Sequence, residues 1–177
     1  MISEAYKTGN VPGPLTAVVV DGRTAGEIMN AARNPLFVVG SMLVTEEAGG
    51  RRLSEYAIEI AKRLSARGCV TITTANAISA FKDVKDVSTK IMGLVEVVDR
   101  LQDPDWGANG KPHDLVVFLG IHYWMASQGL ATLKHFAPHL RTLTLCFMHH
   151  PNADWSFPNM SREDWGKALE EVIRTLR

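Results

Sequence analysis

The sequence has no excess of charge of either sign and no long apolar run. Its 19 lysine and arginine residues balance 19 aspartate and glutamate residues, so the formal net charge is zero. Proteins that neutralise nucleic-acid phosphates carry a basic excess, and we therefore expect no nucleic-acid partner. No apolar run approaches the ~18 residues of a membrane-spanning helix, and no charged segment followed by an apolar core marks a secretory signal. We expect a cytoplasmic protein that does not associate with a membrane.

Cysteine is scarce, with only Cys69 and Cys146. A cubane iron–sulfur cluster needs four thiolate ligands, which two cysteines cannot supply. A structural disulfide is disfavoured in a cytoplasmic protein. Because each cysteine falls at or near a predicted strand, we expect both to be small core residues.

Common catalytic and nucleotide-binding motifs are also missing. Neither Gly-x-Gly-x-x-Gly nor the Walker pattern ending in Gly-Lys-Ser/Thr occurs, which argues against a standard dinucleotide or triphosphate loop. Gly-x-Ser-x-Gly is absent too, and no pair of carboxylates can be placed across a cleft. Independent hydrolytic activity is therefore not expected.

The six histidines form no strong metal-binding pattern. His135 and His139 are four residues apart, but Pro138 interrupts the helix between them and no Glu follows His135 as a zincin requires. His149 and His150 are adjacent, so in an extended chain they point to opposite sides. Structural or solvated histidines are the favoured interpretation.

The pattern that is present is an alternation of strands and helices. Apolar runs at Leu36–Val39 and Leu115–Leu119 have no polar face and predict strands buried on both sides. Strands are also predicted at Cys69–Thr73 and Leu143–Cys146. Apolar residues at helical spacing predict helices over residues 25–32, 53–64, 88–101, 123–136 and 165–176. This alternation predicts an α/β fold with a single doubly wound, mostly parallel sheet and helices on both faces.

The chain divides into an N-terminal arm, residues 1–22, and a single α/β domain, residues 23–177. Ala17–Val20 is expected to form a short strand within the arm. Thr24 and Glu27 match a capping box for the first helix, and Ser161 with Asp164 predicts the cap of the last one. In the helix predicted at residues 88–101, the buried face is expected to carry these apolar residues: Ile91, Leu94, Val95, Val98 and Leu101.

Ligands of open α/β sheets bind at the carboxyl ends of the strands. Three such ends should line up along one edge, followed by a helix that starts near Tyr123 and directs its free N–H groups and positive dipole end to that edge. The glycines that end the two buried strands either admit a ligand or simply make tight turns. The residues predicted to bind a cofactor are Gly40, Ser41, Thr73, Thr74, Gly120, Ile121, His122, Tyr123, Ser127, Asn152 and Asp154.

Aromatic residues gather in the same region: Tyr123, Trp124, Trp155 and Phe157. Such residues are enriched at interface hot spots and in ligand pockets. Core packing, a protein interface and a flavin or nucleotide pocket are three open interpretations. The interface hypothesis places a covered apolar patch on the Met1–Gly22 arm or the Trp155–Met160 loop.

Several stretches resemble one protein family. They are VPGP at residues 11–14, NPLFVVGSML at 34–43, GIHYWMASQGLATLKHFAPHLRTLTL at 120–145 and HPNADWSFPNMS at 150–161. Together they resemble the epsilon subunit of the archaeal acetyl-CoA decarbonylase/synthase complex, over nearly the whole chain. The resemblance implies a DHS-like NAD/FAD-binding fold.

The resemblance also implies a role. It suggests an accessory subunit that stabilises the carbon monoxide dehydrogenase alpha subunit in an alpha2-epsilon2 heterotetramer, or that helps electrons pass to FAD. Nickel and iron–sulfur clusters are then expected only in the partner, and the isolated chain could form a homo-oligomer. The alternatives are a flavin- or nicotinamide-nucleotide-binding electron-transfer module and a free-standing nicotinamide-dependent enzyme.

Overall fold

A seven-stranded, wholly parallel sheet forms the centre of the molecule. The computed structural model describes residues 16–177, and residues 1–15 of the predicted arm lie outside that range. The strand order is β1-β9-β8-β7-β2-β5-β6, and every pairing is parallel. From β1 to β6 across the sheet, the strands are Val18–Val19, Trp155–Ser156, Arg141–Thr144, Leu115–Leu119, Pro35–Val39, Thr71–Thr73 and Thr89–Ile91.

The sheet is doubly wound, as the sequence predicts. From β2 the chain moves outward to β5 and β6, then returns beside β2 as β7 and continues in the opposite direction to β8 and β9. The order therefore reverses between β2 and β7, which makes this pair the topological switch point. Both strands are fully buried, in agreement with their continuous apolar sequences.

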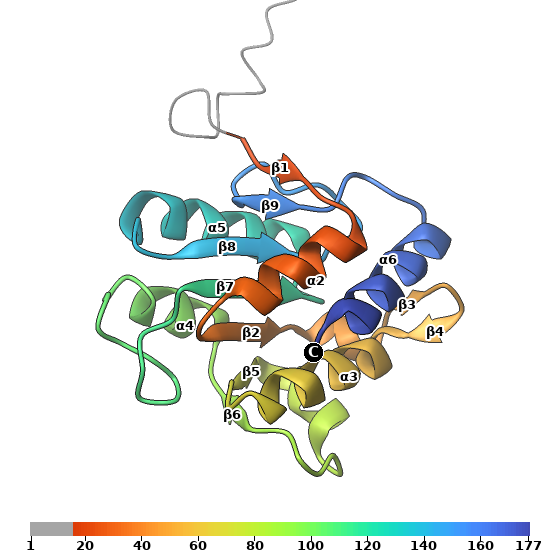
Figure 1. Ribbon diagram of the computed structural model, residues 1–177, viewed down its shortest axis with the longest axis horizontal. Helices are drawn as coiled ribbons and strands as arrows, with labels where there is room; N and C mark the ends of the chain where they lie inside the picture. The colour runs from red at the N-terminus through yellow and green to blue at the C-terminus, as the bar shows by residue number, and fades with distance from the viewer. Residues whose placement is uncertain (1–15) are drawn as a thin grey trace, which may run out of the picture.

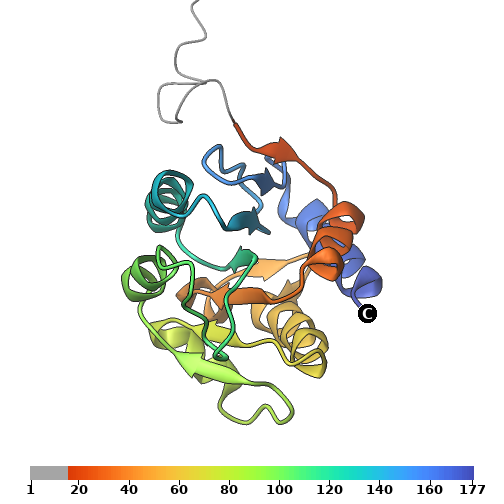
Figure 2. The same ribbon diagram turned by 60° about the vertical axis from the view of Figure 1, so that its left-hand side comes forward.

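Helices cover both faces of the sheet (Figures 1 and 2). The helices α2 (Gly22–Ala31), α3 (Leu53–Ala66) and α6 (Arg162–Thr175) pack on one face, and α4 (Leu94–Arg100) and α5 (Tyr123–Phe136) pack on the other. Two 3₁₀ segments, η1 (Ser41–Val44) and η2 (Ala75–Phe81), follow the strands β2 and β5. A small antiparallel pair, β3 (Glu47–Ala48) and β4 (Arg51–Arg52), precedes α3.

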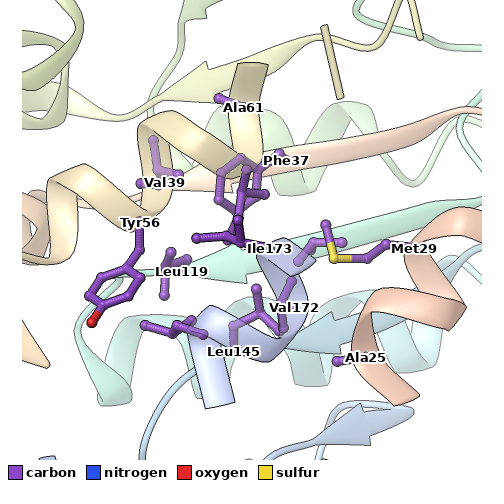
Figure 3. Close-up of a cluster of buried hydrophobic side chains, with 14 of the residues drawn as sticks. Ala25, Met29, Phe37, Val39, Tyr56, Ala61, Leu119, Leu145, Val172 and Ile173 are labelled. Atoms are coloured by element: carbon purple, nitrogen blue, oxygen red, sulfur yellow. The ribbon is translucent and has the colours of Figure 1, made fainter. Parts of the chain in front are cut away.

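Alternate residues of the central strands supply the two cores. Phe37, Val39 and Leu119 point to the face of α2, α3 and α6, where Met29 and Val172 meet them (Figure 3). Leu36, Val38 and Phe118 contribute to the core under α4 and α5. The period-2 alternation of a strand thus allows one apolar sequence to serve both layers.

The helix caps confirm one sequence prediction and correct another. Ser161 caps α6, with its hydroxyl accepting a hydrogen bond from the Asp164 N–H at 3.1 Å. The first helix begins earlier than the predicted capping box, because Asp21 accepts from the Thr24 N–H at 2.7 Å. A carboxylate is a strong N-cap acceptor, so the helix starts three residues before Thr24 would start it.

The segment at residues 88–101 departs most from its prediction. Residues Thr89–Ile91 form β6 beside β5, and α4 begins only at Leu94. The open edge of β5 offers backbone groups that a strand can satisfy and a helix turn cannot. Ile91, predicted to be buried, therefore lies on β6 and is 67% exposed. Val95, also predicted to be buried, is 69% exposed because α4 turns Leu94, Val97 and Val98 toward the core.

Smaller differences concern the last two strands. The strand β8 covers Arg141–Thr144, two residues earlier than predicted, although Leu145 and Cys146 remain buried. Trp155 and Ser156, predicted as part of a loop, form β9. The expected short strand near the N-terminus is confirmed as β1, which pairs with β9.

Candidate functional site

The carboxyl ends of β2, β5 and β7 lie side by side, as predicted. Val39 is in register with Thr73 on one side and with Leu119 on the other. Backbone hydrogen bonds continue just beyond the strands, since the Thr74 N–H donates to the Val39 carbonyl at 3.0 Å and the Met42 N–H donates to the Gly120 carbonyl at 2.9 Å. Segments from three separate parts of the chain thus form one edge.

At the switch point itself, protein atoms fill the space beside both glycines. A Cβ on Gly40 would lie 2.3 Å from the Gly120 carbonyl oxygen. Gly120 has a φ of +68°, and a Cβ there would lie 2.9 Å from Leu43 Cδ2. The close approach of one chain segment to another therefore requires glycine at both positions, a reason that neither the ligand interpretation nor the tight-turn interpretation includes.

A cavity of about 260 Å³ opens beside this point. Four predicted site residues line it: Ser41, Thr74, Ile121 and His122. The remaining walls are Gly93, Leu94 and Met125, contributed by the start of α4 and the first turn of α5. The Thr74 hydroxyl is already engaged, because it donates to the Val39 carbonyl at 3.1 Å.

The helix α5 begins at Tyr123, as predicted, and no side chain within residues 16–177 caps its N-terminus. Its first-turn N–H groups and the positive end of its dipole therefore lie next to the cavity wall formed by His122. Tyr123 does not line the cavity. Its ring stacks on His150 with centroids 4.3 Å apart, and its hydroxyl donates to the His149 carbonyl at 3.3 Å.

Other predicted site residues are engaged elsewhere. The Thr73 hydroxyl donates to the Lys90 carbonyl at 3.4 Å, which joins β5 to β6. The Asn152 side chain is buried and donates to the carbonyl of Ser127, in the second turn of α5, at 3.4 Å. Neither Ser127 nor Asn152 is among the residues that line the cavity.

Asp154 lies at the amino ends of the strands, opposite the carboxyl ends that border the cavity. Its carboxylate accepts hydrogen bonds from the Thr142 N–H at 2.8 Å and the Thr142 hydroxyl at 3.0 Å, and it pairs with Arg141 at 3.1 Å. Arg141 and Thr142 begin β8, so these contacts are at the amino ends of the strands. The prediction that Asp154 lies at the carboxyl ends of the strands was wrong. The strands β8 and β9 are parallel, so the chain between them runs back to the amino ends before Asp154 is reached.

His150 is one of the two adjacent histidines that the sequence predicts to be structural or solvated. It is completely buried, and neither ring nitrogen has a hydrogen-bond partner among the described residues. Burial, with a smaller contribution from the neighbouring His149, lowers the pKa of His150 to about 4. The neighbouring His149 is half-buried, and its Nδ1 lies 3.2 Å from the Phe157 carbonyl oxygen.

The aromatic cluster divides between the core and the surface. Phe157 is fully buried, and Trp155 and Met160 pack partly buried against the same core. Of the two places predicted for a covered apolar patch, the Trp155–Met160 loop thus turns most of its apolar surface to the core of its own chain. Trp124 is 63% exposed on α5, and in the described part of the arm Val18 and Val19 are 59% and 57% exposed.

The described residues also bear on the metal and membrane expectations. Among residues 16–177, no group of three or more His, Cys, Asp or Glu side chains is arranged to hold a metal ion. Both cysteines are free and buried, and burial raises the pKa of each thiol. Within the same range, no helix is long and apolar enough to cross a membrane.

Comparisons with known proteins agree over almost the entire chain. The family described as CO dehydrogenase beta subunit/acetyl-CoA synthase epsilon subunit matches residues 6–173. A protein of Methanothermobacter thermautotrophicus, named acetyl-CoA decarbonylase/synthase complex subunit epsilon, is 39% identical over 92% of this chain and 90% of its own length. A protein of the same name from Methanothrix soehngenii is 30% identical over 97% of this chain and 90% of its own length. The epsilon 1 subunit of Methanosarcina barkeri is 28% identical over 93% of this chain and 92% of its own length.

Proposed function

Because the chain belongs to the family of CO dehydrogenase beta subunits and acetyl-CoA synthase epsilon subunits, we propose that it is the accessory epsilon subunit of an acetyl-CoA decarbonylase/synthase complex. In this role it binds the carbon monoxide dehydrogenase alpha subunit and stabilises it, in an assembly of two alpha and two epsilon chains. The complex as a whole cleaves and forms acetyl-CoA and oxidises carbon monoxide.

One observation carries this proposal. The similarity to named epsilon subunits extends over 92% and 97% of this chain and over 90% of each relative. The similarity therefore covers nearly the full length of each protein and does not stop at part of a larger relative. The apolar side chains that remain exposed on α4 and α5 are consistent with a chain that is covered by another subunit.

Coexpression with the alpha subunit of the same organism tests the assembly directly. We expect the two chains to copurify, and light scattering to give a mass equal to two alpha and two epsilon chains. The alpha subunit should also lose carbon monoxide oxidation more slowly on heating when this chain is present. If the chains elute separately at micromolar concentration and the rate of heat inactivation is unchanged, the accessory role is wrong.

A second function, nucleotide binding with FAD as the first candidate, is supported by the cavity at the sheet edge. Four of the predicted site residues gather there, beside a helix N-terminus that no side chain caps. Ser41 and the first-turn N–H groups of α5 are the groups that would hold a phosphate or the polar edge of a ring. Bound flavin would supply electron transfer.

The size of the cavity limits this second function. Its volume of about 260 Å³ is below the roughly 300–1,000 Å³ typical of sites that enclose a drug-sized ligand. The chain could therefore enclose only part of a dinucleotide, and another subunit would have to complete the site. This is why the docking role is the leading proposal.

Calorimetric titration with FAD and nicotinamide dinucleotides, with and without the alpha subunit, tests the nucleotide proposal. We expect saturable heat that Ser41→Phe abolishes, because the larger side chain fills the cavity. Ser79→Phe, at an exposed position of η2, is the matched control and should bind as the parent does. If no dinucleotide gives heat, even in the presence of the alpha subunit, nucleotide binding is wrong and docking is the remaining proposed function.

A further inference from the structure

A second hollow lies next to the cavity, in the groove between α4 and α5. Its volume is about 270 Å³. Val95 on α4 and Trp124 on α5 form its walls, and both side chains are mostly exposed, at 69% and 63%. The remaining apolar lining consists of Leu94, Val98, Met125 and Gly129.

The surface of α5 has the composition of an interface and not that of a solvated helix. From Tyr123 to Thr132 it carries no charged residue, and the first charge is Lys134. The outward face of α6, by contrast, carries ion pairs such as Glu170–Arg174 and Glu163–Lys167. Depletion of charge together with an exposed Trp (Trp124) and a partly buried Met (Met125) is typical of the buried centre of protein interfaces.

The groove and the sheet-edge cavity are adjacent and share two lining residues. Leu94 and Met125 line both. The ring of Trp124 also stacks on the ring of His122, a cavity residue, with centroids 6.4 Å apart and planes inclined by 17°. A partner that fills the groove therefore lies against one wall of the cavity.

The lining of the groove carries a negative charge. Among the described residues that line this hollow, Asp99 is the charged one. Arg100, which follows it on α4, is paired with Glu96 at 2.9 Å on the same helix. The occupant should therefore combine apolar side chains with a Lys or Arg directed at Asp99.

The shape of the groove favours a helix as the occupant. Its walls are side chains of two helices, whose backbone groups are bonded within those helices, so an added strand would find no backbone partners there. The helix α4 has seven residues, which at ~1.5 Å per residue corresponds to roughly two turns of a helix lying alongside it.

We propose that the groove between α4 and α5 is the docking site for an amphipathic helix of the alpha subunit, with apolar residues seated between Val95 and Trp124 and a basic residue beside Asp99. This inference rests on the proposed accessory role and names the surface that performs it. The docked helix also closes one side of the sheet-edge cavity. A ligand held there would then be enclosed by both subunits.

Single substitutions in the whole chain, followed by titration against the purified alpha subunit, test this inference. We expect Trp124→Glu and Val95→Glu each to weaken the association by about 30-fold or more, the loss typical of a central anchor residue. Both positions are largely exposed, so the isolated variants should keep the melting temperature of the parent. Phe136→Glu is the matched control, because Phe136 is an apolar residue of the same helix, 64% exposed, that does not line the groove.

Charge reversal tests the basic partner residue separately. Asp99→Lys should weaken the association by roughly fivefold at low salt, with a smaller difference at high salt. The control Asp83→Lys reverses an exposed charge outside the groove and should have no effect. A carbodiimide should cross-link Asp99 to a lysine of the alpha subunit in the parent complex.

Each outcome has a distinct meaning. If the parent binds the alpha subunit and both groove variants bind equally well, the docking site is wrong while the accessory role stands. If the parent itself does not bind, the accessory role fails and the inference fails with it. If the isolated chain is a dimer that Trp124→Glu converts to a monomer without affecting alpha binding, the groove binds a second copy of this chain and the inference is overturned.

Discussion

At the scale of single residues, His150 is the most unusual group in the molecule. A buried imidazole normally has a hydrogen-bond partner, yet His150 contacts the face of the Tyr123 ring and bonds through neither nitrogen to a described residue. The loop that carries His150 is held instead through its backbone, because the His150 N–H donates a hydrogen bond to the Ser156 side-chain hydroxyl at 3.0 Å. Burial without a hydrogen-bond partner disfavours the charged imidazolium, so the folded chain favours the neutral form of His150.

This burial predicts a dependence of stability on pH. The pKa of His150 is about 4 in the folded chain, below its ordinary value of 6.5, so the unfolded chain binds the proton more readily. Stability should therefore decrease as pH falls below about 6.5 and continue to decrease until about 4, by on the order of 3 kcal/mol in all. His113 is also buried with a lowered pKa, and it contributes with the same sign.

Chemical denaturation between pH 7 and pH 5 measures the effect. His150→Phe keeps an aromatic ring against Tyr123 and removes the titration, so its stability should vary less with pH than that of the parent. His135→Phe changes an exposed histidine of α5 and should leave the parent slope unaltered. Equal slopes for the parent and His150→Phe would show that His150 is not the titrating group.

At the scale of elements, the ends of helices and strands were the least predictable features. Thr24 and Glu27 have the spacing of a capping box, but Asp21 makes the cap because its carboxylate meets the Thr24 N–H. Local sequence allowed both starts. The observed start packs against α6, because a Cβ on Gly22, the first residue of α2, would lie 2.2 Å from the Ala168 carbonyl oxygen.

The two possible caps make different predictions for stability. Asp21→Ala removes the acceptor of the Thr24 N–H and should reduce the free energy of unfolding by about 1 kcal/mol. Thr24→Ala keeps that N–H and should have an effect within about 0.5 kcal/mol. Urea denaturation at neutral pH compares them. A larger loss for Thr24→Ala than for Asp21→Ala would restore the capping-box interpretation.

The β6–α4 segment shows how packing decides which apolar residues reach the core. A helix over residues 88–101 would have buried both Ile91 and Val95. Residues 89–91 instead pair with β5, and α4 begins only at Leu94. This helix turns Leu94, Val97 and Val98 toward the core and leaves Val95 facing solvent on one wall of the groove. Sequence periodicity alone could not choose between Val95 and Val97.

At the scale of the whole molecule, the expected behaviour is that of a subunit. A partner that binds the folded chain and not the unfolded chain stabilises it by mass action, by about 2.7 kcal/mol when the free partner is at 100 times its dissociation constant. We expect the melting temperature of this chain to rise with the concentration of the alpha subunit. The cavity alone is too small to enclose a dinucleotide, so nucleotides should shift the melting temperature more in the complex than in the isolated chain.

Differential scanning calorimetry of the chain with increasing alpha subunit measures this directly. The Trp124→Glu variant should show little increase over the same range, whereas Phe136→Glu should follow the parent. A melting temperature that is independent of partner concentration for the parent would contradict the subunit role. A shift of equal size in the parent and in Trp124→Glu would contradict only the docking site.

The sequence by itself determined the fold class and the family. Strands that are apolar on every residue can only be buried on both faces, and their alternation with helices requires a parallel sheet between two helical layers. It also identified the three strand ends that meet at one edge, because parallel strands place their carboxyl ends together. Of the residues predicted there, Ser41, Thr74, Ile121 and His122 do line one cavity.

Only the tertiary structure decided which side chains face that cavity and which surface remains open. Asp154 follows β8 in the sequence but lies at its amino end, because the chain crosses the sheet again before β9. Gly40 and Gly120 pack against each other, a contact between segments 80 residues apart that no local pattern reports. Val95 and Trp124 are exposed on two different helices, and their facing positions depend on how those helices pack. Local sequence sets the propensity of each segment, whereas the pairing of distant backbone groups and the packing of helices decide where each segment ends and what it contacts.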